Sequence, residues 1–172
     1  MVRDNPIADR LIAAGAIEFG TFTLASGATS PYYVDIKTAM TDPALLAAVA
    51  AAIAEREPFE VVAGVAVGGV PLAVAVSLAS GRPYAIVRSA VKDHGRADLV
   101  IGAVAGRRVL LVEDVTTSGG SALYGIEELR KAGGVVDCAV TVVDREGGAE
   151  KRLAGVGARL VPLVRARELL AG

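Results

Sequence analysis

The residues best suited to chemistry lie between Val109 and Ser121, in the string VLLVEDVTTSGGS. The apolar run VLLV leads directly into Glu113 and Asp114, so both carboxylates are expected where a strand meets solvent at the edge of a sheet. Hydroxyl-bearing residues and glycines follow, and a helix is expected after them. Hydroxyls and free backbone N–H groups at a helix N-terminus favour phosphate, because the helix dipole attracts negative charge.

Two acids beside a phosphate-binding loop would repel the ligand if both contacted phosphate. The arrangement makes sense if Glu113 and Asp114 accept hydrogen bonds from the two vicinal hydroxyls of a ribose whose 5-phosphate occupies the loop. The alternative is a capped strand–helix turn with solvated acids. The whole string favours the ribose phosphate site, whereas TTSGGS or ED alone would not decide between the two.

The surrounding elements follow an α/β pattern, in which short β-branched runs alternate with helical stretches from Glu60 onward. The predicted strands are 61–67, 84–88, 108–113, 136–143 and 159–164, and the predicted helices are 71–80, 120–132 and 148–154. Strands that are apolar on both faces indicate a parallel sheet covered by helices on both sides. Ligands bind at the carboxyl ends of such strands.

The N-terminal region differs from this pattern. Asn5-Pro6 predicts a helix that ends before Gly15, and Asp42-Pro43 predicts a second one reaching about Glu57. The segment 19–40 between them is irregular and predicts short strands and loops, and the N-terminal region 1–40 is expected to form a small hood. The segment 88–106 is long and charged, and since long loops in compact domains are typically functional, we interpret it as a flexible loop that closes over the site. We expect one domain over residues 1–172.

The bulk composition narrows the functional class. With 18 basic and 19 acidic residues, the chain has no excess of positive charge to attract a polyanion, so nucleic acid is not an expected partner. The charged N-terminus does not resemble a secretory signal, and Cys138 is expected in the core, so a cytoplasmic location is predicted. The uncharged stretch 61–81 has the length of a membrane span, but its glycines and Pro71 favour a strand, a loop and a helix instead.

VLLVEDVTTSGGS resembles the signature of type I phosphoribosyltransferases, and the chain as a whole is similar to the orotate phosphoribosyltransferases, in particular to archaeal-type members. The other segments that support the resemblance are 19–37, 63–73, 87–95 and 142–148. The implied fold is a central parallel sheet of about five strands, with helices on both faces and a small N-terminal hood.

The resemblance also implies roles for individual residues. The implied set for phosphoribosyl pyrophosphate is Arg88, Lys92, His94, Glu113, Asp114, Val115, Thr116, Thr117, Ser118, Gly119, Gly120 and Ser121. Within it, Lys92, His94 and Asp114 would be catalytic, and Lys92 and His94 would reach the neighbouring subunit's site on a flexible loop. A solvated loop position is the alternative for His94.

Thr117, Arg145 and Tyr33 would bind orotate, with Arg145 paired to its carboxylate in the fork geometry of a guanidinium. The alternatives are a surface ion pair of Arg145 with Asp144 or Glu146, and plain packing of Tyr33.

The chain departs from the family at several positions where relatives often carry lysine or another basic residue. These positions are Ala25, Ala28, Ser89 and the pair Gly68-Gly69. Three other basic residues could substitute for them, namely Lys37, Arg96 and Arg107. The departures bear on the turnover rate more than on the ligand.

The expected activity is transfer of ribose 5-phosphate from phosphoribosyl pyrophosphate to orotate, giving orotidine 5'-monophosphate and pyrophosphate. Mg²⁺ is the implied cofactor, with no metal site built from protein side chains, and a homodimer is the implied assembly. Two alternatives stay open: transfer to a purine or another base, and a regulator that senses phosphoribosyl pyrophosphate without turning it over.

Overall fold

The computed structural model describes residues 5–23, 27, 29–89 and 98–170. Its centre is a six-stranded sheet in the order β5-β4-β3-β6-β7-β8. The strands are β3 (Val61–Val65), β4 (Tyr84–Val87), β5 (Val100–Ile101), β6 (Arg108–Thr116), β7 (Val135–Asp144) and β8 (Arg159–Arg165). All pairings are parallel except that of β5 with β4. The predicted parallel sheet of about five strands is therefore confirmed, with one short antiparallel strand added at its edge.

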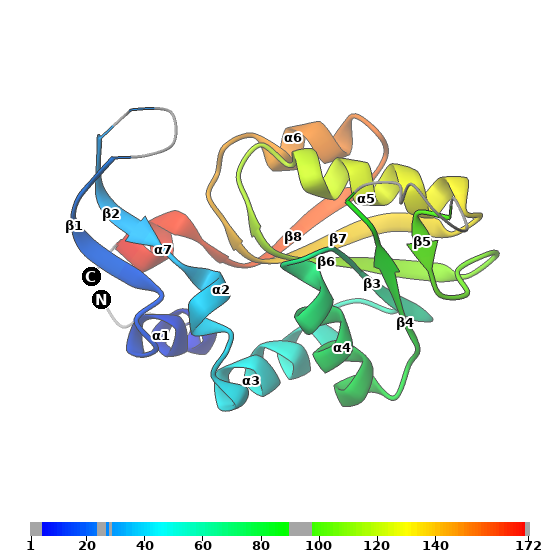
Figure 1. Cartoon of the computed structure of the whole chain (residues 1–172), viewed down its shortest axis with the longest axis horizontal. Coiled ribbons are helices and arrows are strands. Elements are labelled where there is room, and N and C mark those ends of the chain that lie inside the picture. Colours follow the sequence, from blue (N-terminus) through cyan, green and yellow to red (C-terminus); the bar gives the residue numbers. More distant parts are fainter. Residues whose placement is uncertain (1–4, 24–26, 28, 90–97, 171–172) are drawn as a thin grey trace.

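Helices cover both faces of this sheet, as predicted (Figure 1). The helices are α1 (Pro6–Ala13), α2 (Ile36–Ala39), α3 (Pro43–Ala54), α4 (Gly69–Ser80), α5 (Gly120–Lys131), α6 (Ala149–Ala154) and α7 (Ala166–Leu170). Neighbouring residues of β6 face opposite sides: Leu110 joins the core under α1, α3 and α4, and Leu111 joins the core under α5 and α6. The sheet is thus buried on both faces, which explains why its strands are continuously apolar.

A two-stranded antiparallel hairpin forms the predicted hood. It consists of β1 (Ile17–Thr23) and β2 (Thr29–Val34), which pair with each other and not with the central sheet. The hairpin stands beyond the carboxyl ends of the central strands, and α2 leads from it back towards the body (Figure 1). The hood and α2 are therefore on the side of the sheet where ligands of parallel α/β folds bind.

The segment 88–106 differs in part from the predicted loop. Val100 and Ile101 pair with Val87 and Ile86, and Val104 is buried in the core. The end of this segment therefore belongs to the sheet edge, while 90–97 lies outside the described residues.

The uncharged stretch 61–81 divides into β3 and α4, as expected. Across the described residues, no helix has both the length and the apolar character needed to cross a membrane.

Candidate active site

The carboxyl ends of neighbouring parallel strands bring the predicted site residues to one edge of the sheet. Gly64 of β3 is in register with Val112 of β6, and Thr116 of β6 is in register with Asp144 of β7. The loop after β3, the string after β6 and the turn after β7 are consequently adjacent. Sequence segments that are far apart in the chain meet here because the sheet aligns their ends.

Glu113 and Asp114 lie near the carboxyl end of β6, and both are almost fully shielded from solvent, with 4% and 6% of their surface exposed. Burial is the main cause that raises the pKa of Glu113 to about 7, and the neighbouring Asp114 carboxylate contributes to this rise. Ser121 opposes the shift by donating a hydrogen bond from Oγ to Glu113 Oε1 at 2.9 Å. The first turn of α5 is thereby tied to the acidic pair.

Lys37, from α2, is the cation that faces this pair. Its Nζ lies 2.8 Å from Oδ2 of Asp114. That oxygen is buried and accepts no directed hydrogen bond from any described residue, so the contact is an ion pair without further support. Contact with the Asp114 carboxylate raises the pKa of Lys37, which keeps the ammonium charged.

The loop after β6 has the form expected of a phosphate-binding turn. Thr117 and Ser118 are exposed, and Gly119 takes a positive φ of 77° just before α5, where a β-carbon would meet Ala149 at 2.9 Å. No side chain caps the N-terminus of α5. The backbone N–H groups of this turn are therefore available to an anion, as helix N-termini commonly are.

Thr116 differs from its neighbours in this loop. It is still part of β6, it is buried, and its hydroxyl donates a hydrogen bond to Asp144 Oδ1 at 3.2 Å. Its side chain is thus committed to a contact within the protein.

The turn after β7 presents Arg145 next to the phosphate-binding loop. The backbone N–H of Arg145 donates to the carbonyl of Thr116 at 2.8 Å, and a β-carbon on Gly147 would meet Thr117 at 2.7 Å. Two candidate orotate residues, Thr117 and Arg145, are therefore on adjoining turns.

The ion pairs that the sequence allowed for Arg145 do not form. Asp144 contacts Arg165 at 3.7 Å, and Glu146 contacts Arg167 at 2.9 Å. No ion pair of Arg145 occurs within the described ranges, and its side chain is only half-buried.

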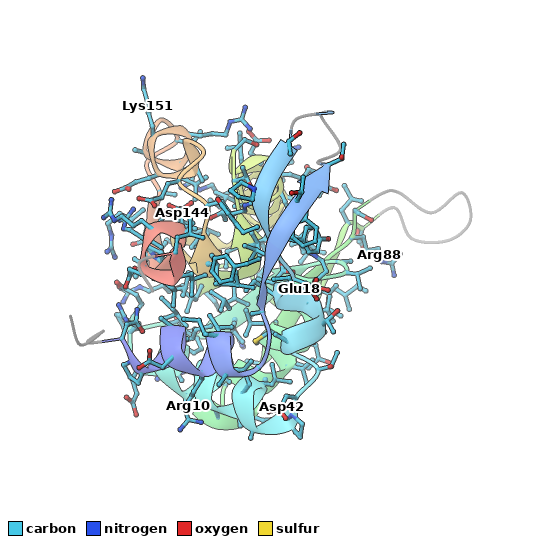
Figure 2. The ribbon with its side chains drawn as sticks, turned by 90° about the vertical axis from the view of Figure 1, so that its left-hand side faces the viewer. Arg10, Glu18, Asp42, Arg88, Asp144 and Lys151 are labelled. Atoms are coloured by element: carbon cyan, nitrogen blue, oxygen red, sulfur yellow. The ribbon has the colours of Figure 1, made fainter. Side chains whose placement is uncertain are left out.

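Arg88 and Tyr33 lie further from these turns. Arg88 follows β4, and its carbonyl accepts a hydrogen bond from Tyr124 of α5 at 2.8 Å. Tyr33 is on the separate hairpin, where its ring packs against Phe22 at 5.7 Å. Figure 2 shows Arg88 and Asp144 on opposite sides of the hairpin when the molecule is viewed from the hood. Lys92, His94, Ala25, Ala28 and Arg96 lie outside the described residues.

Two basic residues near the site carry no motif of their own. Lys37 is one of the three possible substitutes for the missing basic residues, and the sequence alone does not place it. No motif in the sequence points to Arg152 of α6, yet a β-carbon on Gly120 would lie 3.4 Å from its Nη1. The sequence signal that could have indicated this proximity is the set of glycines at 119 and 147–148, because they let the loops after β6 and β7 approach each other closely.

Cys138 is buried, as expected, and burial raises the pKa of its thiol to about 11. It is therefore a core residue and not a reactive thiol.

Comparison with known proteins assigns this site to a class. The chain matches the model of the phosphoribosyl transferase domain over residues 38–156, and it is thus a phosphoribosyltransferase by family. The orotate phosphoribosyltransferase of Methanoculleus marisnigri is 66% identical over 168 residues, covering 98% of this chain and 99% of the relative. That of Methanocorpusculum labreanum is 64% identical over 167 residues, covering 97% and 99%. The chain therefore belongs to the orotate phosphoribosyltransferases.

Solved structures agree with this assignment. Orotate phosphoribosyltransferase from Aeropyrum pernix superposes with a TM-score of 0.84 at 34% identity, over 96% of each chain. The Mycobacterium tuberculosis enzyme in complex with 5-phospho-α-D-ribosyl 1-diphosphate superposes with a TM-score of 0.76 at 31% identity, over 95% of this chain and 98% of that one. The type I phosphoribosyltransferase fold is thus confirmed.

Proposed function

We propose that this chain transfers the ribose 5-phosphate group of phosphoribosyl pyrophosphate to N1 of orotate, as its family membership indicates. The bond from C1 of the ribose to the pyrophosphate oxygen breaks, a bond from C1 to N1 forms, and the N1 proton is released. Glu113 and Asp114 accept hydrogen bonds from the ribose hydroxyls, and the turn from Thr117 to Ser121 binds the 5-phosphate. Arg145 pairs with the carboxylate of orotate.

Three groups assigned to ligand binding are incompletely satisfied by the described residues of the protein, and this observation supports the proposal. Asp114 is buried with an oxygen that accepts no hydrogen bond, the turn before α5 is uncapped, and Arg145 has no ion pair within the described residues. Buried polar groups are normally satisfied inside a protein, so such an exception indicates a partner from outside. One ligand with two hydroxyls and a phosphate satisfies the first two, and a carboxylate satisfies the third.

Mg²⁺ fits this site as a cofactor carried by the substrate. The described residues contain no cluster of three or more metal-binding side chains, whereas Glu113 and Asp114 offer carboxylate oxygens beside the expected pyrophosphate. Mg²⁺ commonly keeps waters and phosphate oxygens as ligands, so it would be held mainly by the substrate and would need no metal site built from protein side chains. When bound, it supplies neutralisation of the charge that develops on the leaving pyrophosphate.

We also propose that the protein is a homodimer in which Lys92 and His94 reach the neighbouring subunit's site, and that Arg88 contacts the pyrophosphate group. A cytoplasmic location and the absence of a nucleic-acid partner stay predictions from the sequence.

The test is release of pyrophosphate from phosphoribosyl pyrophosphate and Mg²⁺ with each free base in turn. We expect release with orotate only, and a loss of about a hundredfold or more in kcat/KM for orotate in Arg145→Ala, since a bidentate charged contact is removed. Arg167→Ala is the matched control, because this arginine is exposed and already paired with Glu146. Binding of phosphoribosyl pyrophosphate without release would contradict the enzyme, and release with a purine base would contradict the acceptor.

A further inference from the structure

The loop between β3 and α4 cannot carry a side chain on its inner face. A β-carbon on Gly68 would lie 2.8 to 2.9 Å from three carboxyl atoms of Asp114, and one on Gly69 would lie 2.9 Å from the carbonyl oxygen of Val112. Carbon atoms do not approach fixed neighbours this closely, so a residue larger than glycine would displace Asp114 or β6. A lysine at either of these two positions would have no room here.

A cavity of about 310 Å³ adjoins this loop. Its walls come from the loop itself, from the first turn of α4 and from the α2–α3 segment, and most of them are apolar. The charged groups that line it are Lys37 and Asp114. The N-terminus of α4 also faces it and lacks a side-chain cap, since Gly68 is its N-cap. Within the first turn of α4, the N–H of Val70 already donates to the carbonyl of Val67 and Pro71 has no N–H, which leaves the N–H groups of Gly68 and Gly69. The cavity therefore combines these two backbone donors with one cation and one carboxylate.

Among the residues that the structure describes, Lys37 makes a single ion pair in this cavity. Its side chain is 69% exposed, while that of Asp114 is 9% exposed, and the 2.8 Å ion pair joins them. If the ribose hydroxyls donate hydrogen bonds to the Asp114 carboxylate, the Lys37 ammonium loses part of this contact. Its flexible side chain then allows the ammonium to move. A lysine ammonium is a mobile point charge with three donors, which suits a phosphate group that arrives beside it.

We propose that Lys37 binds the pyrophosphate group of the substrate, supplying from α2 the positive charge that the glycine loop cannot carry. This inference rests on the proposed function. In the free protein Lys37 neutralises Asp114. In the complex, Asp114 accepts hydrogen bonds from the ribose, and Lys37 contacts the pyrophosphate oxygens together with the N–H groups of Gly68 and Gly69. As the bond to C1 breaks, the ammonium stabilises the charge that collects on the leaving group.

The alternative is that Lys37 serves only as a counter-ion for Asp114. The two roles differ in which ligand they affect. A counter-ion keeps Asp114 ready for the ribose, so its loss weakens every ligand that contains ribose 5-phosphate. A pyrophosphate contact matters only for ligands that contain pyrophosphate.

The experiment compares Lys37→Gln with the parent protein by calorimetric titration, because the chain has no tryptophan to report binding by fluorescence. The two ligands are phosphoribosyl pyrophosphate with Mg²⁺ and ribose 5-phosphate. We expect affinity for the first to fall about tenfold or more, since a charged hydrogen bond is lost, and affinity for the second to change less than about threefold. Equal losses for both ligands, or no loss for either, would overturn the proposal.

Two further variants make the result specific. Lys131→Gln is the matched control, because Lys131 is also 69% exposed and pairs with Glu128, at the far end of α5. It should leave both affinities unchanged. Lys37→Arg keeps the charge and should recover most of the affinity for phosphoribosyl pyrophosphate, and a failure to recover it while the fold is intact by circular dichroism would count against a charge contact.

Orotate-dependent release of pyrophosphate by the parent protein is measured first. A protein without this release contradicts the proposed function, whereas full release by both the parent and Lys37→Gln, with unchanged KM and kcat, contradicts the role of Lys37 alone.

Discussion

The ends of β6 and β7 both carry a buried aspartate, and the surroundings of these two aspartates differ. Asp144 is 2% exposed, and its carboxylate accepts hydrogen bonds from the hydroxyl of Thr116 and the backbone N–H of Glu146, with Arg165 alongside at 3.7 Å. Asp114 is 6% exposed, yet one of its oxygens has only the ion pair with Lys37. Among the described residues, the Asp144 carboxylate thus accepts two hydrogen bonds, both at Oδ1, whereas Oδ2 of Asp114 is buried and accepts none.

This difference separates structural from functional roles at the same edge of the sheet. Asp144 fixes the turn that presents Arg145, and it needs nothing from a ligand. Asp114 is shielded from water without being satisfied by protein, which is unfavourable unless a ligand completes its contacts. Burial alone therefore does not distinguish the two roles, whereas the count of hydrogen-bond partners does.

The same truncation at both aspartates tests this difference directly. Asp144→Ala leaves the hydroxyl of Thr116 and the backbone N–H of Glu146 without their acceptor and removes one of the two ion pairs of Arg165, so we expect a loss of about 3 kcal/mol in the free energy of unfolding. Asp114→Ala removes a carboxylate whose partner is an exposed lysine, so we expect a change below about 1 kcal/mol. In kcat/KM for phosphoribosyl pyrophosphate, Asp114→Ala should lose about a hundredfold, since charged hydrogen bonds to the ribose are removed.

Urea unfolding and steady-state kinetics measure the two quantities on the same preparations. Because both variants lose the same atoms, the truncation itself is controlled. Unchanged kinetics in Asp114→Ala, or an equal loss of stability in both variants, would refute the division of roles.

Glu113 is the second buried acid near the end of β6, and its titration makes the stability of the protein depend on pH. Its pKa is about 7 in the folded protein against an ordinary value of 4.5. The folded state therefore holds the proton more tightly than the unfolded state. The resulting contribution to stability is fully present below pH 4.5 and is lost as pH rises through 7, amounting to about 2 to 3 kcal/mol.

Glu113→Gln removes this titration but keeps the shape of the side chain. We expect the difference in unfolding free energy between the variant and the parent protein to shift in favour of the variant from pH 5 to pH 8.5. Urea unfolding at both pH values measures this shift. Parallel profiles for the two proteins would show that Glu113 does not titrate in this range.

Much of this edge could be predicted from the sequence, since apolar runs stop at Glu113-Asp114 and at Asp144-Arg145 and so mark the strand ends. The length of β6 could not be predicted. The sequence predicts that the strand ends at 113 and that Thr116 lies in the phosphate-binding loop, but pairing with Asp144 on β7 extends the strand through Thr116. The pairing of a strand depends on its neighbour, which a single segment does not reveal.

The contact of Lys37 with Asp114 is a second feature beyond the reach of the sequence. It depends on α2, a four-residue helix in an irregular segment, and on where the hood places that helix. The two-residue strand β5 was missed for a similar reason, because its only support is pairing with β4. Long periodic elements are therefore predictable here, whereas short ones are set by tertiary contacts.

The smallest expected effect concerns α6, which follows β7 but approaches the loop after β6. Arg152 is exposed and unpaired within the described residues, and its guanidinium lies beside Gly120, the first residue of α5. Arg152→Ala should raise the KM for phosphoribosyl pyrophosphate about threefold, because an exposed charge contributes below about 1 kcal/mol. Lys151→Ala is the matched control, since its side chain extends away from the body of the protein (Figure 2). Steady-state kinetics at low and high salt measure both variants. An equal rise in KM for both would indicate a general effect of charge on α6. A rise confined to Arg152→Ala would show that the β7 side supplies a phosphate contact as well as the turn that Asp144 holds.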